Sequence, residues 1–434
     1  MSERFDAIVV GAGPAGCSAA YAMAKEGLHV LVIERGEYPG SKNVSGALLH
    51  SHVLSSLFPN FWEEAPVERF VTQRKLSFLT PDTSLTVDFR DDYFAKPPYN
   101  GFTVLRSKFD PWLAKKAEDA GALIMTGTQV DDFLWEGDRV MGVKTRKQDG
   151  EVLAHVVIIA EGANSILTQK AGLRGDMSPH EMAIGAKEVI RLSEEIINER
   201  FNLKGNEGAS IHYIGECTGG VPGGGFLYTN MNSISLGLVC RISDLAKKRL
   251  KIFELVERFK SHPHIRSLIA GGVLKEYSGH MIPEGGYKAI PKLFRGGLLV
   301  VGEAASLNFN NGLILRGIDY AMASGMAAAR TVSLARSNGD FSEKGLSRYR
   351  KELEGSFVLK DMKRFKGLPD ILSNPRIFST YPDLLCSLGR EMFQVTGGER
   401  RRVLSIFNEV RRREGSRAGI GRIIKDLLKM GYQI

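Results

Sequence analysis

Cysteine is scarce in this sequence of 434 residues. The four cysteines are Cys17, Cys217, Cys240 and Cys386, and no two of them form a CxxC pair. This spacing argues against a zinc site, a haem-attachment site or an iron–sulfur cluster held by this chain alone. Scattered cysteines in a chain of this length are typical of a protein in a reducing cytoplasm. We therefore predict that the chain binds no metal.

Long apolar runs are also absent. No run reaches 18 residues, so we expect no helix that crosses a membrane. The first residues, MSERFDAIVVGAG, lead directly into an apolar strand pattern, without the basic and apolar regions of a signal peptide. With 43% apolar and 25% charged residues, the composition is that of an ordinary soluble protein, and its length suffices for two or three interleaved subdomains. The expected location is cytoplasmic.

Acidic residues are few at the C-terminal end. The whole chain carries a net charge of +9, and from Glu399 onward there are ten Arg or Lys residues but only four Asp or Glu residues. The segment therefore supplies +6 of the excess charge. Two interpretations remain open: a solvated helical face, or a contact with anionic lipid or with an acidic partner protein.

The most specific pattern in the chain is FDAIVVGAGPAGCSAAYAMAKEGLHVLVIERG, which begins at residue 5. Residues 5–10 form a short apolar run, as a buried parallel strand requires. Gly11, Gly13 and Gly16 then form a GxGxxG turn, which permits a tight turn, a close approach to a pyrophosphate and close packing of strand and helix. The expected helix, residues 15–25, presents free N–H groups to the phosphates.

A second strand pattern over residues 28–33 ends at Glu34, 23 residues after Gly11. This is the position of the acid that binds a ribose in dinucleotide folds. A glutamate here disfavours a 2′-phosphate on the bound adenosine. The unit of strand, glycines, helix, strand and acid predicts a bound dinucleotide, but it does not separate NAD from FAD.

Two later stretches favour FAD. Residues 156–165, VVIIAEGANS, and residues 297–306, GLLVVGEAAS, are apolar strands that end in a small residue and a glutamate. The second is followed by NNG and a helical pattern over residues 317–329. FAD is longer than NAD, and Glu303 at the end of a late strand can accept hydrogen bonds from ribityl hydroxyls. The N-terminus of the following helix can stabilise negative charge on a reduced flavin.

Several stretches together carry a resemblance to one family. They are GAGPAGCSAA, SKNVSGALLH (41–50), VLRSKFDPWL (104–113), AEGANS, GGGFLYTN (223–230), SLGLVC (235–240), EYSGHMIPEGG (276–286) and LILRGIDYAMASG (313–325). The chain resembles the FAD-binding fold of p-hydroxybenzoate hydroxylase and its relatives. Within that group it is most similar, over nearly its whole length, to the FixC/EtfC flavoproteins and the electron-transfer-flavoprotein:quinone oxidoreductases.

The chain departs from the family pattern in two respects. Glu161 and Glu303 stand where the family usually has aspartate, so a carboxylate is kept but is one methylene longer. The mitochondrial quinone oxidoreductases also carry cluster-binding cysteines in a C-terminal extension, which this chain lacks. That absence matches the bacterial and archaeal FixC/EtfC type, in which a separate ferredoxin-like subunit resembles that extension.

The motifs and the resemblance together predict a set of FAD contacts. They are Gly11, Gly13, Pro14, Ala15, Gly16, Glu34, Arg35, Lys42, Asn43, Val44, Ser45, Gly46, Arg106, Val130, Ala160, Glu161, Gly162, Gly302, Glu303, Asn311, Gly312 and Leu313. By resemblance, the loop at residues 42–46 passes the isoalloxazine ring, where small residues let the backbone touch the ring. The alternatives are a plain surface loop here and an exposed side chain at Arg106.

The predicted fold class is α/β. We expect a Rossmann-like FAD-binding domain of the glutathione-reductase-2 type, an inserted and largely antiparallel β domain for a quinone or another substrate, and a helical, basic C-terminal region for partner and membrane-surface contact. The respective boundaries are 1–75 with 102–183 and 297–333, then 76–101 with 184–296, then 334–434. Residues 376–393 either dip into a membrane surface or form a core-facing helix, and the sequence alone favours the helix.

No catalytic nucleophile, acid–base pair or metal set stands out in the sequence. His212 and His280 lie alone in the middle region, where a single histidine is more often structural. We therefore predict no catalytic side chain, because in an electron-transfer protein the flavin carries the chemistry and the protein sets its position and potential.

The resemblance implies an FAD-dependent electron-transfer oxidoreductase. Its expected donors are the alpha and beta subunits of an electron-transfer flavoprotein together with a ferredoxin-like iron–sulfur subunit, and its acceptor is a membrane quinone, menaquinone or ubiquinone. In such relatives the partner system can be electron-bifurcating, which would make this chain the quinone branch of a complex that oxidises NADH and reduces ferredoxin. The expected location is then the cytoplasmic membrane surface, and no nucleic-acid partner is expected.

Two other functions remain open. One is a stand-alone enzyme of the same fold, either a geranylgeranyl (prenyl-lipid) reductase or an NAD(P)H-dependent flavin hydroxylase. The other is a non-redox scaffold in which FAD is purely structural.

Overall fold

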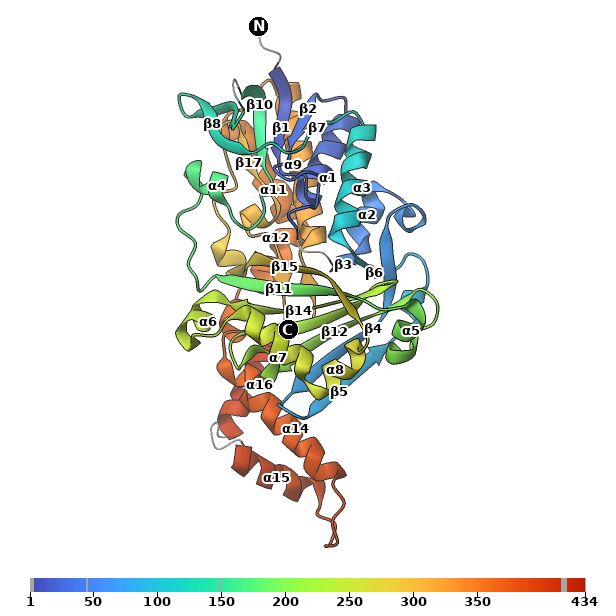
Figure 1. Ribbon diagram of the computed structural model, residues 1–434. Coiled ribbons are helices and arrows are strands. Elements are labelled where there is room, and N and C mark those ends of the chain that lie inside the picture. Colours follow the sequence, from blue (N-terminus) through green and yellow to red (C-terminus); the bar gives the residue numbers. More distant parts are fainter. Residues whose placement is uncertain (1–3, 44–45, 148–149, 415–419, 434) are drawn as a thin grey trace.

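The computed structural model describes residues 4–43, 46–147, 150–414 and 420–433 (Figure 1). Two sheets lie one above the other along the long axis of the molecule in this view, and the C-terminal helices extend beyond the second sheet. Val44 and Ser45, which the sequence places at the flavin, lie outside the described residues.

The first sheet contains the strand–helix–strand unit that begins at residue 4. Its strands, in spatial order, are β16 (Phe294–Arg295), β17 (Leu298–Val300), β10 (Glu151–Ile159), β1 (Arg4–Val10), β2 (Val30–Ile33) and β7 (Leu123–Met125), and β8 (Val130–Glu136) with β9 (Arg139–Thr145) extends it from β10. From β17 to β7 the strands are parallel. Their carboxyl ends therefore meet at one edge, which is where such sheets bind ligands.

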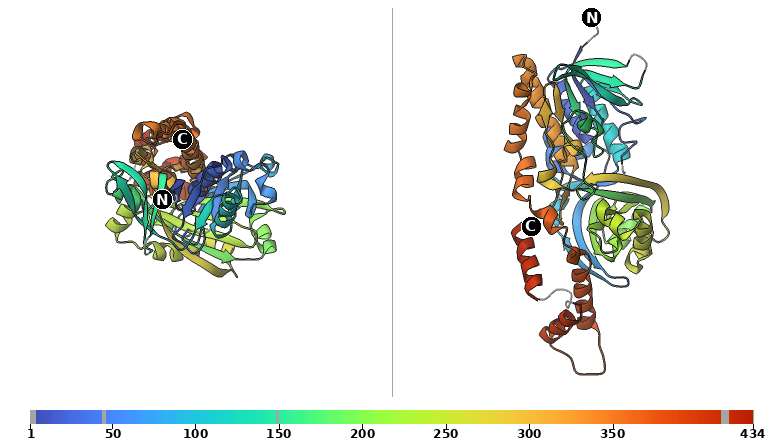
Figure 2. Two further views of the ribbon diagram at one scale, coloured as in Figure 1. Left: turned by 90° about the horizontal axis from the view of Figure 1, so that it is seen from above. Right: turned by 90° about the vertical axis from the view of Figure 1, so that its left-hand side faces the viewer.

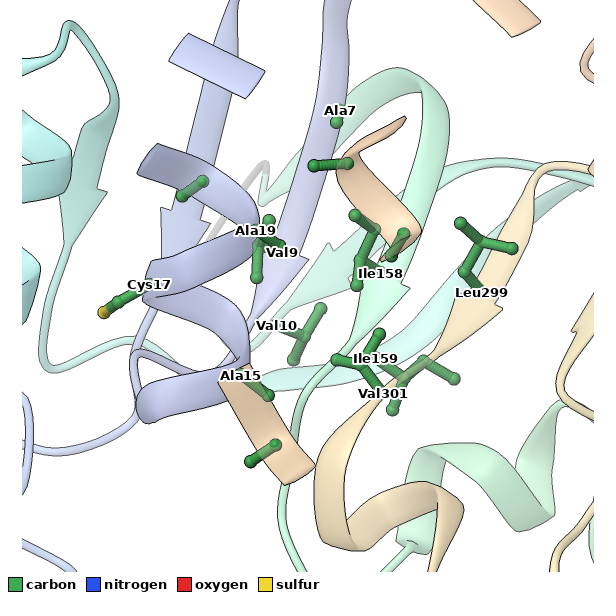
Figure 3. Close-up of a cluster of buried hydrophobic side chains, with 14 of the residues drawn as sticks. Ala7, Val9, Val10, Ala15, Cys17, Ala19, Ile158, Ile159, Leu299 and Val301 are labelled. Atoms are coloured by element: carbon green, nitrogen blue, oxygen red, sulfur yellow. The ribbon is translucent and has the colours of Figure 1, made fainter. Parts of the chain in front are cut away.

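Apolar strands and small helical residues explain the packing of this half. Figure 3 shows Val9 and Val10 of β1, Ile158 and Ile159 of β10 and Leu299 of β17 in one buried cluster. Helix α1 (Pro14–Lys25) packs closely against α9 (Ile318–Asn338). A Cβ at Gly325 of α9 would lie 2.1 Å from the carbonyl oxygen of Ala15, so only glycine permits this approach.

Other helices complete the first half. They are α2 (Ser51–Leu57), α3 (Arg106–Asp119), α4 (Ile166–Lys170), α10 (Glu343–Leu346), α11 (Arg348–Gly355) and α12 (Phe357–Arg364).

The second sheet is largely antiparallel. In spatial order its strands are β15 (Val273–Pro283), β11 (Met182–Arg191), β14 (Ser233–Arg241), β13 (Gly223–Thr229), β12 (Glu207–Gly215), β4 (Val67–Leu79), β6 (Gly101–Val104) and β3 (Ala47–His50), with β5 (Ser84–Arg90) beside β4. Only β12 and β4, among the described pairs, run parallel. Helices α5 (Glu194–Phe201), α6 (Ile242–Lys248), α7 (Ile252–Ser261) and α8 (Pro263–Ile269) lie on its outer side (Figure 1).

The domain boundaries expected from the sequence do not follow this sheet. The boundary between residues 75 and 76 falls inside β4, and β3 and β6 pair in the second sheet although both were assigned to the FAD-binding domain. The reason is tertiary: β3 hydrogen-bonds to β6, and β6 hydrogen-bonds to β4 of the second sheet. The division into domains otherwise stays a prediction.

The C-terminal region consists of α13 (Leu368–Ile371), α14 (Thr380–Phe393), α15 (Val403–Glu414) and α16 (Ile420–Gln433). Figure 2 shows these helices along one side of the molecule and beyond its second sheet. Pro382, Leu384 and Cys386 of α14 are buried, and the Cys386 thiol contacts the carbonyl oxygen of Phe78 in β4. This helix is therefore core-facing, as the sequence favoured. In the described part of the chain, no helix combines the length and the hydropathy needed to cross a bilayer.

Candidate functional site

A cavity of about 740 Å³ lies at the carboxyl edge of the first sheet and continues beneath the second sheet. The turn after β1, the end of β2, the start of α3 and the turns after β10 and β17 form one part of its wall. Strands β12–β15 and the segment 362–378 form the other part. The cavity is thus shared between the two sheets and the C-terminal region.

The turn after β1 presents backbone donors to the cavity. Gly13, Pro14 and Ala15 line it, and α1 begins there with no side-chain cap and no acid in its first turn. A Cβ at Gly11 would lie 2.4 Å from the carbonyl oxygen of Ala160, and one at Gly16 would lie 2.0 Å from that of Gly11. The glycines therefore bring the free helix N-terminus to the wall, where it favours an anion such as a pyrophosphate.

Glu34 lies at the end of β2, and backbone N–H groups orient its carboxylate. One oxygen accepts a hydrogen bond from Ala12 N–H at 2.9 Å, and the other accepts one from Gly36 N–H at 2.7 Å. Each carboxylate oxygen retains further acceptor capacity for ribose hydroxyls. Glu34 and Arg35 both line the cavity.

Arg106 is the first residue of α3, and Leu105 separates it from the end of β6. Its guanidinium donates two hydrogen bonds to Asp110, at 2.6 and 2.7 Å, and Asn43 donates a third to the same carboxylate at 2.8 Å. Burial lowers the pKa of Arg106, but the charge of Asp110 and its hydrogen bonds outweigh this effect and raise it overall. Arg106 is therefore a fixed positive charge in the cavity wall and not an exposed arginine.

The two late glutamates have different surroundings. Both oxygens of Glu161 are engaged at the start of α4, where they accept hydrogen bonds from Leu167 N–H and from the N–H and hydroxyl of Thr168. Burial raises the pKa of Glu161, and these bonds oppose the rise. Glu303 is 29% exposed, and within the described chain its carboxylate has a side-chain contact with His280, at 3.4 Å. Of the two carboxylates, Glu303 is therefore the one that protein hydrogen bonds occupy less, which suits an acceptor for a ribityl chain.

The segment after Ser306 turns back across the cavity. Strands β18 (Phe309–Asn310) and β19 (Leu315–Arg316) form a short hairpin. The side chain of Asn311 accepts hydrogen bonds from Leu313 N–H and Ile314 N–H, at 3.0 and 2.7 Å, and so fixes the tip of the hairpin. Asn311 therefore shapes the turn, while Gly312 faces the cavity.

Most of the predicted contacts meet at this cavity. Those that line it are Gly11, Gly13, Pro14, Ala15, Glu34, Arg35, Lys42, Asn43, Gly46, Arg106, Val130, Ala160, Glu161, Gly162, Gly302, Glu303 and Gly312. Gly16, Asn311 and Leu313 are not among the lining residues. Gly16 serves helix packing, and the side chain of Leu313 is 49% exposed.

Sequence reasoning missed the apolar limb of the cavity, which extends away from the phosphate-binding turn. Its aromatic and aliphatic walls come from β13, the end of β15 and the C-terminal segment: Phe226, Tyr228, Ile282, Pro283, Phe365, Leu368, Leu372, Ile377 and Phe378. His212 of β12 also lines it, with Nε2 buried and without a hydrogen-bond partner in the described chain. No local spacing signals this limb, because its walls come from three distant segments.

Arg241, at the end of β14, is another cavity residue that sequence reasoning missed. It is 4% exposed, lines the apolar limb, and its Nε has no hydrogen-bond partner within the described residues. Glu284 lies on the same wall, and burial raises its pKa while the charge of Arg241 opposes the rise. A buried Nε–H without an acceptor is costly, so this donor is available to an oxygen of a ligand in the cavity.

The residues present fit FAD. The α1 N-terminus supplies donors for a pyrophosphate, Glu34 an acceptor for a ribose and Glu303 an acceptor for a polyol chain. The apolar limb leaves space for a second, apolar molecule beside the cofactor. One cavity can therefore hold both a dinucleotide cofactor and a substrate.

Comparisons with known proteins agree with this site. Residues 6–94 match the FAD dependent oxidoreductase model, and residues 368–432 match the ETF-QO/FixC family C-terminal domain. The chain is 47% identical to the probable electron transfer flavoprotein-quinone oxidoreductase YdiS of Escherichia coli K12, over 91% of this chain and 92% of the relative. It is 44% identical to the FixC protein of the same organism over 99% of each chain.

Solved structures share the fold. A geranylgeranyl bacteriochlorophyll reductase-like protein from Thermoplasma acidophilum superposes with a TM-score of 0.73 at 21% identity, covering 99% of this chain and all of that one. The flavin-dependent brominase Bmp2 superposes with a TM-score of 0.65 at 16% identity, over 95% of this chain and all of that one.

Proposed function

We propose a function for this chain from the family to which it belongs, the ETF-QO/FixC flavoproteins. It is a flavoenzyme that uses FAD as its cofactor in electron transfer. The proposal is that it accepts electrons from an electron-transfer flavoprotein, made of alpha and beta subunits, with a ferredoxin-like iron–sulfur subunit, and delivers them to a membrane quinone.

The observation that carries the proposal is that the phosphate-binding turn and the apolar limb line one continuous cavity. The phosphate-binding turn and Glu303 lie along one part of it, and the apolar limb begins beyond them. A quinone has a polar ring and an apolar tail, which suits aromatic walls that contain a buried arginine. A soluble, highly polar substrate would make few favourable contacts with those aromatic and aliphatic walls.

Within this proposal, the protein binds and orients the reactants. FAD, when bound, would supply the redox chemistry for reducing a quinone to a quinol, with two electrons and two protons taken up by the quinone. The α1 N-terminus, Glu34 and Glu303 would hold the cofactor, and Asp110 binds both Arg106 of α3 and Asn43 of the cavity wall. Arg241 donates to a quinone oxygen, and His212 remains uncharged because burial lowers its pKa to about 4.

Exposed apolar and basic side chains of the C-terminal region support contact with a membrane surface. Phe393, at the end of α14, is 82% exposed, and Leu404 of α15 is 72% exposed beside Arg401 and Arg402. Exposed apolar side chains among basic residues suit the surface of an anionic membrane, from which a quinone would enter. We therefore propose peripheral association with the cytoplasmic membrane.

The experiment that tests the function begins without partners. We would mix the purified, FAD-loaded chain with NADH and then NADPH under anaerobic conditions and follow the flavin absorbance. We expect no bleaching, together with rapid reoxidation of chemically reduced protein by a quinone analogue. Fast bleaching by either nicotinamide would instead support a stand-alone prenyl-lipid reductase or a flavin hydroxylase, for which the apolar limb also has room. A flavin inert to chemical reductant would point to a structural cofactor.

In its fullest form, the proposal places this chain on the quinone branch of a bifurcating complex. Such a complex oxidises NADH and divides the electrons between a low-potential ferredoxin and the quinone. The test is reconstitution with the electron-transfer flavoprotein and the ferredoxin-like subunit. Ferredoxin reduction by NADH that requires quinone supports this form, and ferredoxin reduction without quinone contradicts it.

A further inference from the structure

Lys187 is a buried lysine that links the two halves of the cavity. It lies in the middle of β11, opposite Gly237 of β14 and Ser278 of β15. Its side chain is buried, with the residue only 6% exposed, and its Nζ donates a hydrogen bond to the carbonyl oxygen of Gly46. A side chain from the second sheet thus holds the end of the loop that lines the cofactor part of the cavity.

The surroundings of the Lys187 ammonium come from several elements. Phe226 of β13 lies below it, with Nζ 5.7 Å from the ring centroid. Ser235 of β14 lies against Gly46, because a Cβ on that glycine would be 2.0 Å from the serine hydroxyl. The charged groups that act on it are Arg106 of α3 and Glu276 of β15. Gly46, Phe226 and Arg106 all line the cavity, so the ammonium lies directly behind its wall.

The residue next to Lys187 in the strand has a different role. The next residue of β11, Glu188, points to the opposite side of the strand and pairs with Lys260 of α7 at 2.9 Å. That pair joins the sheet to its covering helix. Lys187, by contrast, directs a charge toward the cavity, where burial makes the charge costly.

We propose that Lys187 is a positioning residue that fixes the loop at Gly46 and, through its ammonium charge, sets the reduction potential of the bound flavin. A positive charge behind the wall stabilises negative charge that develops on a flavin when it is reduced. This inference rests on FAD as the cofactor, and it deepens the proposed electron-transfer function by assigning the control of its potential.

The charge of Lys187 is also sensitive to pH. Burial lowers its pKa to about 7, Arg106 lowers it in the same direction, and Glu276 opposes them. The ammonium is therefore charged below about pH 7 and loses its proton above it while the flavin is oxidised. Negative charge on the reduced flavin favours the charged form, so reduction above pH 7 draws a proton onto Lys187. The potential of the flavin consequently falls more steeply with pH in that range.

The test measures the reduction potential of the bound flavin against pH, by equilibration with reference dyes, from about pH 6 to about pH 9. In Lys187→Met we expect a potential lower at pH 7 by about 30 mV, a tenfold change for a two-electron couple, and a shallower decline above pH 7. In Lys187→Arg we expect the potential at pH 7 to be kept and the steeper decline to disappear, because arginine does not titrate there. Lys260→Met is the matched control and should keep both properties.

Two outcomes would overturn the inference: an unchanged potential and slope in FAD-loaded Lys187→Met, or the wild-type slope in Lys187→Arg. The arginine variant decides the matter if the methionine variant fails to bind FAD. Quinone reduction is measured separately. A shifted potential with no quinone reduction in any variant would remove the proposed acceptor but leave the role of Lys187 intact.

Discussion

The carboxylate of Asp110 accepts hydrogen bonds from Arg106, one helical turn earlier, and from Asn43, in the loop that precedes β3. Asp110 thus links α3 to the loop that contains Asn43, and both Arg106 and Asn43 line the cavity. Asp110 itself is 1% exposed, so the pair with Arg106 is shielded from water.

Replacing Asp110 by Asn should destabilise the chain and reduce its FAD content. The change leaves the Arg106 charge without its partner, which costs about 3–5 kcal/mol for a buried pair. Thermal unfolding and the flavin-to-protein ratio measure the two effects. Asp119→Asn is the control, because Asp119 pairs with Lys115 on the same helix at the same spacing but in solvent. Solvent screens that exposed pair, so equal losses in the two variants would contradict the assigned role.

Replacing Glu303 by Ala should weaken FAD retention. The ribityl hydroxyls would lose a charged acceptor worth about 1.5–3 kcal/mol, which corresponds to roughly a 10- to 150-fold rise in Kd. Flavin fluorescence during titration of the apoprotein gives the constant. Glu343, whose carboxylate pairs with Lys292 far from the cavity, supplies the control variant Glu343→Ala. Full flavin occupancy in purified Glu303→Ala would remove Glu303 from the cofactor site.

Replacing Arg241 by Met should separate substrate binding from cofactor binding. We expect the KM for a quinone analogue to rise by about tenfold, because the ligand oxygen loses a charged donor. The melting temperature is a separate readout and should fall, because Glu284 loses the charge that offsets its burial. FAD content should not change. Arg191→Met, at the exposed end of β11, is the control. An unchanged KM would show that Arg241 does not meet the substrate.

The attachment of α16 should depend on the charge of Asp426. Its carboxylate accepts hydrogen bonds from Asn374, Arg376 and Tyr381. Burial raises the pKa of Asp426, but the bonds from Tyr381, Arg376 and Asn374 outweigh it and lower the pKa overall.

A lowered pKa in the folded chain means that this stabilisation is present above the usual carboxyl pKa of about 4 and is lost as the pH falls through the folded value. The protection of α16 against hydrogen exchange, taken relative to the intrinsic rate at each pH, should therefore be constant between neutrality and about pH 5 and should fall in stronger acid. Asp426→Asn should show low protection already at neutral pH. Asp370→Asn, which removes an exposed partner of Lys288, should not.

Membrane association should need both the basic and the apolar residues of the C-terminal helices. Leu404 of α15 and Leu428 of α16 are 72% and 70% exposed. Changing both to Ser should weaken binding to vesicles that contain anionic lipid, and added salt should weaken the wild type. Val87→Ser, on β5, is the control, because Val87 is also exposed, at 58%, but lies outside the C-terminal helices. If deletion of residues 399–434 leaves sedimentation with vesicles unchanged, the tail has another role.

The cofactor-binding half of the fold could be predicted from the sequence because its motifs are local. The turn at Gly11 and Gly13, the acid at Glu34 and the late strand before Glu303 each depend on a few neighbouring residues. The structure confirms a strand, a helix and a strand where the first pattern predicted them. Glu161 shows the limit of prediction from local motifs. Its motif resembles that of Glu303, but its carboxylate accepts hydrogen bonds from backbone N–H groups of α4.

By itself, then, the sequence determined the fold class, the FAD-binding elements and the family. Strand periodicity, glycine geometry and helix termini follow from short-range sterics and hydrogen bonding, which a linear pattern records. Only the tertiary structure decided that β3 and β6 belong to the second sheet, that Arg241 is buried in an apolar wall, and that Lys187 reaches Gly46. These relationships join residues more than a hundred positions apart in the case of Lys187, and burial and partner charges exist only once the two sheets meet.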